Sequence, residues 1–219
     1  MLSGLLDERQ AVRTRALSDI HEILHHQNTL YAVTAPAALY VAAILSDPRT
    51  ERPVDKRRQD FPGNMRAELL AWIASVSREV TDEAEAVSRQ HGFPLDDYGP
   101  AIAVREIRPL LFPAVFTYAD STDRHVRESA IGACIPLLDD PQLIHHRSTV
   151  IPQIRQALGT SELWQHREQA ISALETWGED PSGIEGQQNP FLFCDTDPPA
   201  HSSPWNAGPK AGWADEPPF

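Results

Sequence analysis

The sequence predicts an all-α protein. Nearly every periodic segment before residue 178 of the 219-residue chain spaces its apolar side chains as one face of a helix. No segment alternates apolar and polar residues between hairpin turn signals, which is the pattern of a half-buried strand. With 41% hydrophobic and 23% charged residues, the chain is able to bury a sizeable core. We therefore expect helices packed around a core, without a central sheet.

The first two helices are expected at residues 12–27 and 35–45. Along 12–27 the apolar residues fall on one side of a 3.6-residue helix, from Val12 to Leu24. Residues 35–45 are apolar nearly all round and carry Pro36 in the first turn, which is typical of a short helix buried between neighbours. Asp47 and the proline after it then begin a polar loop.

A short motif recurs along the chain, as in helical repeat proteins. Its four copies are Val12-Arg13-x-x-Ala16-Leu17, Met65-Arg66-x-x-Leu69-Leu70, Val126-Arg127-x-x-Ala130-Ile131 and His166-Arg167-x-x-Ala170-Ile171. Each copy begins an expected helix, and three are preceded by a helix that contains a proline: Pro36, Pro113 and Pro152. An acidic residue precedes each arginine, where we expect it to cap the helix and neutralise the guanidinium. These residues are Asp7, Asp60, Asp123 and Glu162.

This helix–turn–helix pattern resembles the HEAT-repeat family over about residues 1–177, and the whole chain resembles HEAT-repeat proteins of high-GC actinobacteria. The best single match is the segment from Leu110 to Leu138. The resemblance implies a short, curved α-solenoid of about four helix pairs. Only the last interval between the repeat arginines fits the usual period of ~40–47 residues. The longer intervals imply insertions at 47–62 and 80–98.

The second insertion contains a helix signal of its own. Thr81 followed by acidic residues predicts a capped helix that reaches Arg89, and the stretch from Gly92 to Pro100 is rich in turn residues. A plain connector is the default interpretation of this excursion, and a binding element is the alternative.

From residue 178 the composition changes. The segment 178–219 holds eight of the nineteen prolines and five of the eleven glycines, which predicts an extended arm. It also holds the aromatic residues Phe191, Phe193, Trp205, Trp213 and Phe219. We expect the arm to fold back over the end of the last repeat, near Trp164 and Trp177, because terminal repeats need a cap. Capture of a partner by the aromatic residues is the alternative.

One motif has the form of a catalytic site. His21-Glu22-x-x-His25 is the pattern in which two histidines bind zinc and the glutamate activates water. A zinc metallopeptidase is therefore an alternative function. However, Tyr31 stands where a metzincin has its third histidine. Helical phase also places both histidines towards the flank and the solvent side of their helix. We assign no catalytic residue, metal or cofactor.

Charge and hydropathy limit the classes of partner. The net charge is −12, and the one basic run, Lys56-Arg57-Arg58, lies among acidic residues. This balance argues against nucleic acid as a partner, so a HEAT-like DNA glycosylase is a second, less favoured alternative. No apolar run has the length of about 18–20 residues that a bilayer requires, and no secretion signal is visible. We expect a cytoplasmic protein with no membrane contact.

The function that these observations favour is a non-catalytic protein-binding scaffold or adaptor. The resemblance implies that the second helix of each pair lines a concave face that binds another protein. The acidity suggests a basic partner, and a toxin-neutralising immunity protein is one such role. The sequence leaves the oligomeric state open. Candidate partner-binding residues are Glu22, Trp72 and Arg78 on the helices, and Trp205, Trp213 and Phe219 in the arm.

Overall fold

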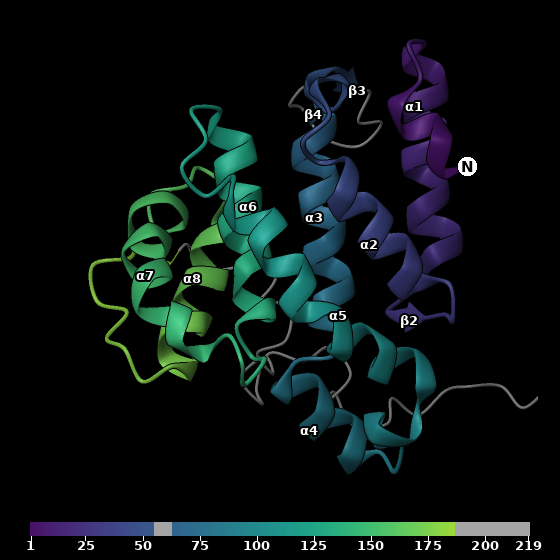
Figure 1. Cartoon of the computed structure of the whole chain (residues 1–219). Coiled ribbons are helices and arrows are strands. Elements are labelled where there is room, and N and C mark those ends of the chain that lie inside the picture. The colour runs from purple at the N-terminus through teal and green to yellow at the C-terminus, as the bar shows by residue number, and fades with distance from the viewer. Residues whose placement is uncertain (55–62, 187–219) are drawn as a thin grey trace, which may run out of the picture. The chain divides into compact units, whose positions relative to one another are not determined.

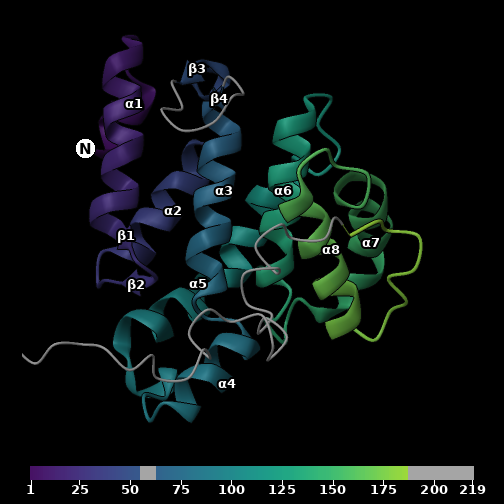
Figure 2. The ribbon, with the colours of Figure 1, turned by 180° about the vertical axis from the view of Figure 1, so that it is seen from behind.

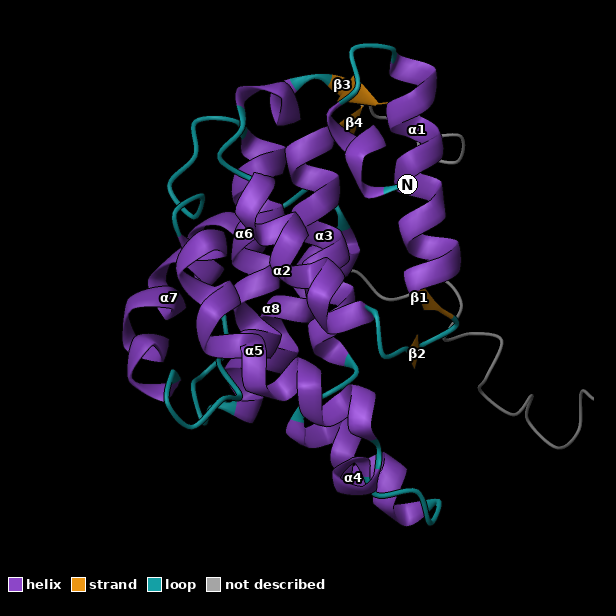
Figure 3. Ribbon diagram, turned by 45° about the vertical axis from the view of Figure 1, so that its right-hand side comes forward, coloured by secondary structure: helices purple, strands orange, loops and turns teal. Residues whose placement is uncertain are grey.

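The computed structural model describes residues 1–54 and 63–186, and this part of the chain is mostly helical, as predicted (Figures 1 and 3). Residues 1–186 form one compact unit. Two short antiparallel strand pairs, orange in Figure 3, interrupt the helices without forming a larger sheet among the described residues. None of the helices in the described ranges has both the length and the apolar character needed to cross a bilayer.

The first half of the chain forms three α-helices and both strand pairs. The 3-10 turn η1 (Leu2–Leu6) precedes α1 (Gln10–Asp19), which continues into the π-helical turn η2 (Ile20–Leu24). Strands β1 (His25–His26) and β2 (Thr29–Leu30) lead to α2 (Thr34–Ile44). The 3-10 turn η3 (Pro48–Glu51), β3 (Pro53–Val54) and β4 (Gly63–Asn64) lead to α3 (Met65–Arg78).

The described part of the second half contains helices and helical turns joined by loops, and no strand. It begins with α4 (Asp82–Gln90), the 3-10 turn η4 (Leu95–Asp97) and α5 (Gly99–Phe116). Helix α6 (Arg124–Leu137) follows, then η5 (Ile144–His146) and α7 (Arg147–Gln153). The π-helical turn η6 (Ile154–Leu158) and α8 (Trp164–Thr176) complete it. The prolines predicted in the first helix of three pairs lie in α2, α5 and α7.

The helices pack both against their neighbours in sequence and against helices further along the chain. Helix α2 packs against α3 and α5, and α3 packs against α6. Helix α6 also contacts α5, η6 and α8. The two opposite views in Figures 1 and 2 both show α6 between α3 and α8. Burial of apolar side chains between these helices stabilises the fold, with α3 and α6 contributing the largest sets of buried residues.

The repeat arginines bind backbone carbonyls. In three copies the Nη1 atom donates to the carbonyl oxygen six residues earlier, in the turn that enters the helix. The pairs are Arg13 with Asp7 at 3.0 Å, Arg127 with Ser121 at 2.5 Å, and Arg167 with Ser161. The motif therefore satisfies carbonyl groups that the turn leaves without a helical partner.

The acidic residues of the repeat were predicted to cap the helices and neutralise these arginines, and that is correct only in part. Asp123 caps α6 by accepting hydrogen bonds from the backbone of the next turn. The carboxylates of Asp7 and Glu162 do not cap their helices. They pair with Arg9 and Arg124, and Asp7 is also attracted by the charge of the repeat residue Arg13. Helix α3 is capped instead by Asn64, and Asp60 lies outside the described residues. A guanidinium has five donors in a planar fork, which suits it to several carbonyls at once.

The first helix is shorter than the predicted segment 12–27. It ends at Leu24, whose carbonyl oxygen accepts a hydrogen bond from Thr34 Oγ1 at 2.5 Å. Gln27 and Asn28 then adopt positive φ angles of 48° and 61°, as a two-residue hairpin turn requires. β1 and β2 pair on either side of this turn, with His25 opposite Leu30. We refer to residues 25–30 as the β1–β2 hairpin.

The start of the predicted arm does fold back onto the last helices. Arg155 donates to the carbonyl oxygen of Asp180 at 2.6 Å, and Arg167 Nε donates to that of Glu185 at 2.9 Å. Between these contacts Ile184 packs, partly buried, beside Gly159. The five aromatic residues predicted to dock from this arm lie outside the described residues.

Candidate protein-binding surface

Three of the predicted groove residues are described, and the structure overturns one of them. Glu22 and Arg78 are exposed, as expected. Trp72 has no exposed surface, and its indole Nε1 donates to the Ile20 carbonyl oxygen at 3.2 Å. The tryptophan therefore packs in the core between α3 and η2 and is not a partner contact. The other three candidates, Trp205, Trp213 and Phe219, lie outside the described residues.

The histidine–glutamate motif does not form one helical face. Because the helix ends at Leu24, His25 lies in a strand and turns inward, with 7% of its surface exposed. The prediction that His25 faces solvent is wrong. Its Nδ1 atom lies 2.8 Å from Ser75 Oγ, and its Nε2 atom lies 3.3 Å from Glu79 Oε1. These contacts hold the β1–β2 hairpin against α3. Across residues 1–54 and 63–186, no group of three or more His, Cys, Asp or Glu is arranged to hold a metal ion.

The most exposed large apolar side chain among the described residues, that of Phe93, lies in the segment 81–100, which we call the α4 excursion. None of its twenty residues is buried. Phe93 is 75% exposed, Val87 50% and Tyr98 39%. A single exposed apolar side chain is ordinary, whereas several on one segment mark a candidate interaction surface. The excursion is therefore the strongest candidate for a functional surface among the described residues.

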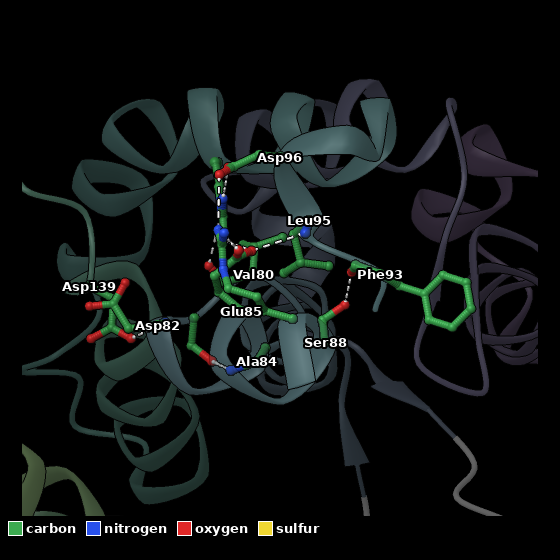
Figure 4. A network of polar contacts seen from close by, with 12 residues as sticks. Val80, Asp82, Ala84, Glu85, Ser88, Phe93, Leu95, Asp96 and Asp139 are labelled. Carbon is green, nitrogen blue, oxygen red and sulfur yellow. Dashed lines mark hydrogen bonds and ion pairs between the residues drawn. The ribbon is translucent and has the colours of Figure 1, made fainter. Parts of the chain in front are cut away.

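The local sequence explains the shape of the excursion. Thr81 caps α4 by accepting a hydrogen bond from the Ala84 backbone at 3.2 Å, as predicted from the sequence. Gly92 ends the helix with a φ of 82°, a conformation that glycine adopts without strain. Ser88 then donates to the carbonyl oxygen of Phe93, which fixes the backbone beside the exposed ring. In Figure 4 the ring of Phe93 points away from the polar residues of the excursion.

A network of ion pairs braces the excursion from within (Figure 4). Glu85 accepts hydrogen bonds from Arg89, from Arg105 at 3.0 Å and from the Leu95 backbone at 3.1 Å. Asp96 lies 2.7 Å from Arg105 and 3.4 Å from Arg89. Desolvation opposes ionisation of Glu85, but the hydrogen bonds from Arg105 and Arg89 outweigh it and lower the pKa of this carboxyl. The network ties α4 and η4 to each other and to α5.

A pocket of about 580 Å³ lies between the excursion and the β1–β2 hairpin. At one side Tyr98 donates its hydroxyl hydrogen to the carbonyl oxygen of Leu30, which links the start of α5 to β2. The lining combines aromatic and aliphatic side chains with a few polar groups, the usual chemistry of a binding pocket. The lining residues are Asn28, Thr29, Ser88, Gly92, Phe93, Pro94, Leu95, Asp97 and Tyr98.

The surface around this pocket is acidic. Five acidic residues and one arginine stand between Thr81 and Pro100. That arginine, Arg89, is already paired within the network. The exposed residues Glu83 and Asp97 make no ion pair with any other described residue. The excursion thus presents negative charge next to an exposed aromatic ring.

The comparisons with known proteins give no match: neither a protein-family model, nor a curated protein, nor a solved structure matches this chain. The assignment of a function therefore depends on the geometry of the α4 excursion. Sequence reasoning had located this excursion as an insertion but had selected none of its residues. The available signal was Phe93 placed between Gly92 and Pro94, a large apolar residue inside a turn.

Proposed function

We propose that this chain is a non-catalytic protein-binding scaffold of the HEAT-repeat type, and that the α4 excursion is its binding surface. The contacts of α2 with α3, of α5 with α6, and of α8 with η6, the turn that continues α7, support a short α-solenoid. The observation that carries the proposal is the 75% exposure of Phe93 on a segment braced by ion pairs. Exposed aromatic side chains that become buried on association are the commonest centres of binding energy in protein interfaces.

The ion-pair network of the α4 excursion favours binding because it reduces the conformational entropy lost on association. A flexible loop would have to be ordered when a partner binds, at a cost of about 0.5–1.5 kcal/mol for each immobilised side chain. Here Glu85 and Asp96 already hold the turn that carries Phe93. The backbone that carries the ring is therefore already held in place before any partner arrives.

The acidity of the surface favours a basic protein as the partner. Negative charge around the pocket raises the rate of association with a positive surface and repels nucleic acid. A role as an immunity protein that neutralises a basic toxin is a specific form of this function. Such a role needs no reactive group on the scaffold.

The test is to identify a partner and to measure its dependence on Phe93. The full-length protein and a Phe93→Ala variant are used in parallel to capture proteins from a lysate of the native host. Any protein that the wild type retains stoichiometrically is then purified and its affinity measured. Ser172→Ala, an exposed change on α8, serves as the control. We expect the affinity to fall on the order of tenfold or more for Phe93→Ala. Equal affinities for all three proteins, or an empty capture, would overturn the proposal.

A further inference from the structure

We propose that the pocket beside Phe93 takes an arginine side chain of the partner protein, with its guanidinium paired to the carboxylate of Asp97. This inference deepens the proposed function and rests on it, because it names the chemistry of the partner at the same surface. Three features of the pocket carry it: an unbalanced negative charge, two aromatic rings, and a volume larger than one side chain.

The first feature is the charge of Asp97. Its neighbours form a balanced set, in which Glu85 and Asp96 are paired with Arg89 and Arg105. Asp97 lines the pocket and has no ion pair with a described residue, and no lysine or arginine is among the lining residues. A carboxylate at the wall of a partly enclosed pocket attracts a cation more strongly than one in open solvent.

The second feature is the pair of aromatic rings, Phe93 and Tyr98, that line the same pocket as Asp97. A guanidinium group stacks on aromatic faces while its N–H groups donate to a carboxylate, which an ammonium group does less well. The aliphatic stem of an arginine also packs against an apolar wall such as that provided by Leu95. The lining therefore matches both parts of an arginine side chain.

The third feature is size. A pocket of about 580 Å³ falls within the range that accommodates small ligands, so residues flanking the arginine also enter it. Asn28, Thr29 and Ser88 supply hydrogen-bonding groups for the backbone of such a segment. The chain's own segment 187–219 is a poor match in charge, because it contains four acidic residues and a single lysine. The occupant is therefore a basic segment of another protein.

The experiment is an NMR titration of the full-length protein with matched octapeptides. The probe is Gly-Ser-Leu-Arg-Arg-Leu-Ser-Gly, and its control replaces both arginines by citrulline, which keeps the shape and removes the charge. We expect shift changes at Asn28, Thr29, Leu95 and Tyr98 with the arginine peptide. We expect binding on the order of tenfold weaker for the citrulline peptide.

Two variants complete the test. Asp97→Asn keeps the shape of the side chain, removes its charge and should weaken binding of the arginine peptide to the level of the citrulline peptide. Glu175→Gln, an exposed change on α8, should leave it unaltered. Equal binding of the two peptides, shift changes away from the pocket, or unaltered binding by Asp97→Asn would each overturn the inference.

Failure of this inference is distinguishable from failure of the proposed function. If a captured partner depends on Phe93 but binds Asp97→Asn as tightly as the wild type, the arginine assignment is wrong and the binding surface stands. If the arginine peptide binds through Asp97 but no protein binds through Phe93, the chemistry of the pocket stands and the scaffold function is wrong.

Discussion

The guanidinium of Arg105 on α5 donates to the carboxylate of Glu85 on α4, with Nη2 3.0 Å from Oε2. The two residues are twenty positions apart, and their contact joins the excursion to the body of the protein. The same guanidinium reaches Asp96 at the end of the turn through Nη1. One arginine of helix α5 therefore holds both helical parts of the α4 excursion, α4 through Glu85 and η4 through Asp96.

Replacing Arg105 by methionine should loosen the excursion without unfolding the protein. Glu85 and Asp96 would lose their shared partner, but these ion pairs are only partly buried, and ion pairs near the surface contribute about 0–1 kcal/mol to global stability. We expect faster proteolysis within residues 91–98 and a melting temperature lowered by a few degrees at most. Limited proteolysis with mass spectrometry measures the first effect. Arg9→Met, which breaks a surface ion pair elsewhere, is the control. Equal cleavage in both variants would show that Arg105 does not hold the excursion in place.

Replacing Trp72 by alanine should destabilise the fold strongly, because this residue is a core residue. The change leaves a cavity and removes the hydrogen bond from the indole to the Ile20 carbonyl, and large-to-small core changes of this kind cost about 3–5 kcal/mol. Urea unfolding at neutral pH measures the loss. The neighbouring exposed change Ala71→Ser should cost less than about 0.5 kcal/mol. Similar stabilities for the two variants would show that Trp72 is not packed as described.

The stability should fall in acid because of Glu128, which is buried between α6 and α8. Burial raises the pKa of this carboxyl, but the contacts with His166 and Arg124 outweigh burial and hold the pKa at about 2. A carboxyl whose pKa is lower in the folded state stabilises the fold above the unfolded pKa. That stabilisation disappears as the pH falls from about 4.5 towards 2.

The measurement compares the wild type with Glu128→Gln at several pH values. At pH 7 the wild type should be more stable by about 2–3 kcal/mol, as estimated from unfolding in denaturant. The difference should shrink progressively below pH 4.5 and be small near pH 2. A difference that stays constant over this range would show that the carboxyl does not ionise in the contact described.

A methyl group at Gly159 should disrupt the packing of the segment 178–186. A Cβ atom there would lie 2.5 Å from the carbonyl oxygen of Arg155 and 3.1 Å from the side chain of Ile184. We expect Gly159→Ala to cost about 1–3 kcal/mol and to speed hydrogen exchange in 178–186. Gly99→Ala is the matched control, because nothing lies within 4 Å of the added atom and its φ is not positive. Unchanged exchange in Gly159→Ala would argue against this packing.

The helical content and several local features could be predicted from short stretches of sequence. Helical periodicity, the proline in the first turn of α2 and the caps at Thr81 and Asp123 act within one or two turns of the chain, so their physics is local. These predictions agree with the structure, and the insertion at 80–98 does contain the predicted helix.

The candidate site could not be predicted in this way because long-range contacts build it. His25 turns inward because the helix ends at Leu24, whose carbonyl oxygen accepts a hydrogen bond from Thr34 Oγ1. The imidazole of His25 then contacts Ser75 and Glu79 of the α3 region. Helical phase alone predicted that His25 faces solvent and that Trp72 lies on a binding face. A helical wheel does not show which neighbouring helix will cover each side of the helix.

The pocket depends on the same kind of contact. Its walls come from residues 28–29 and 88–98, and the hydrogen bond from Tyr98 to Leu30 joins segments 68 positions apart. Local sequence specifies which segments become helices, because backbone propensity and capping involve near neighbours. Only tertiary packing decides which side chains remain exposed and which come together, because burial depends on every element that folds against them.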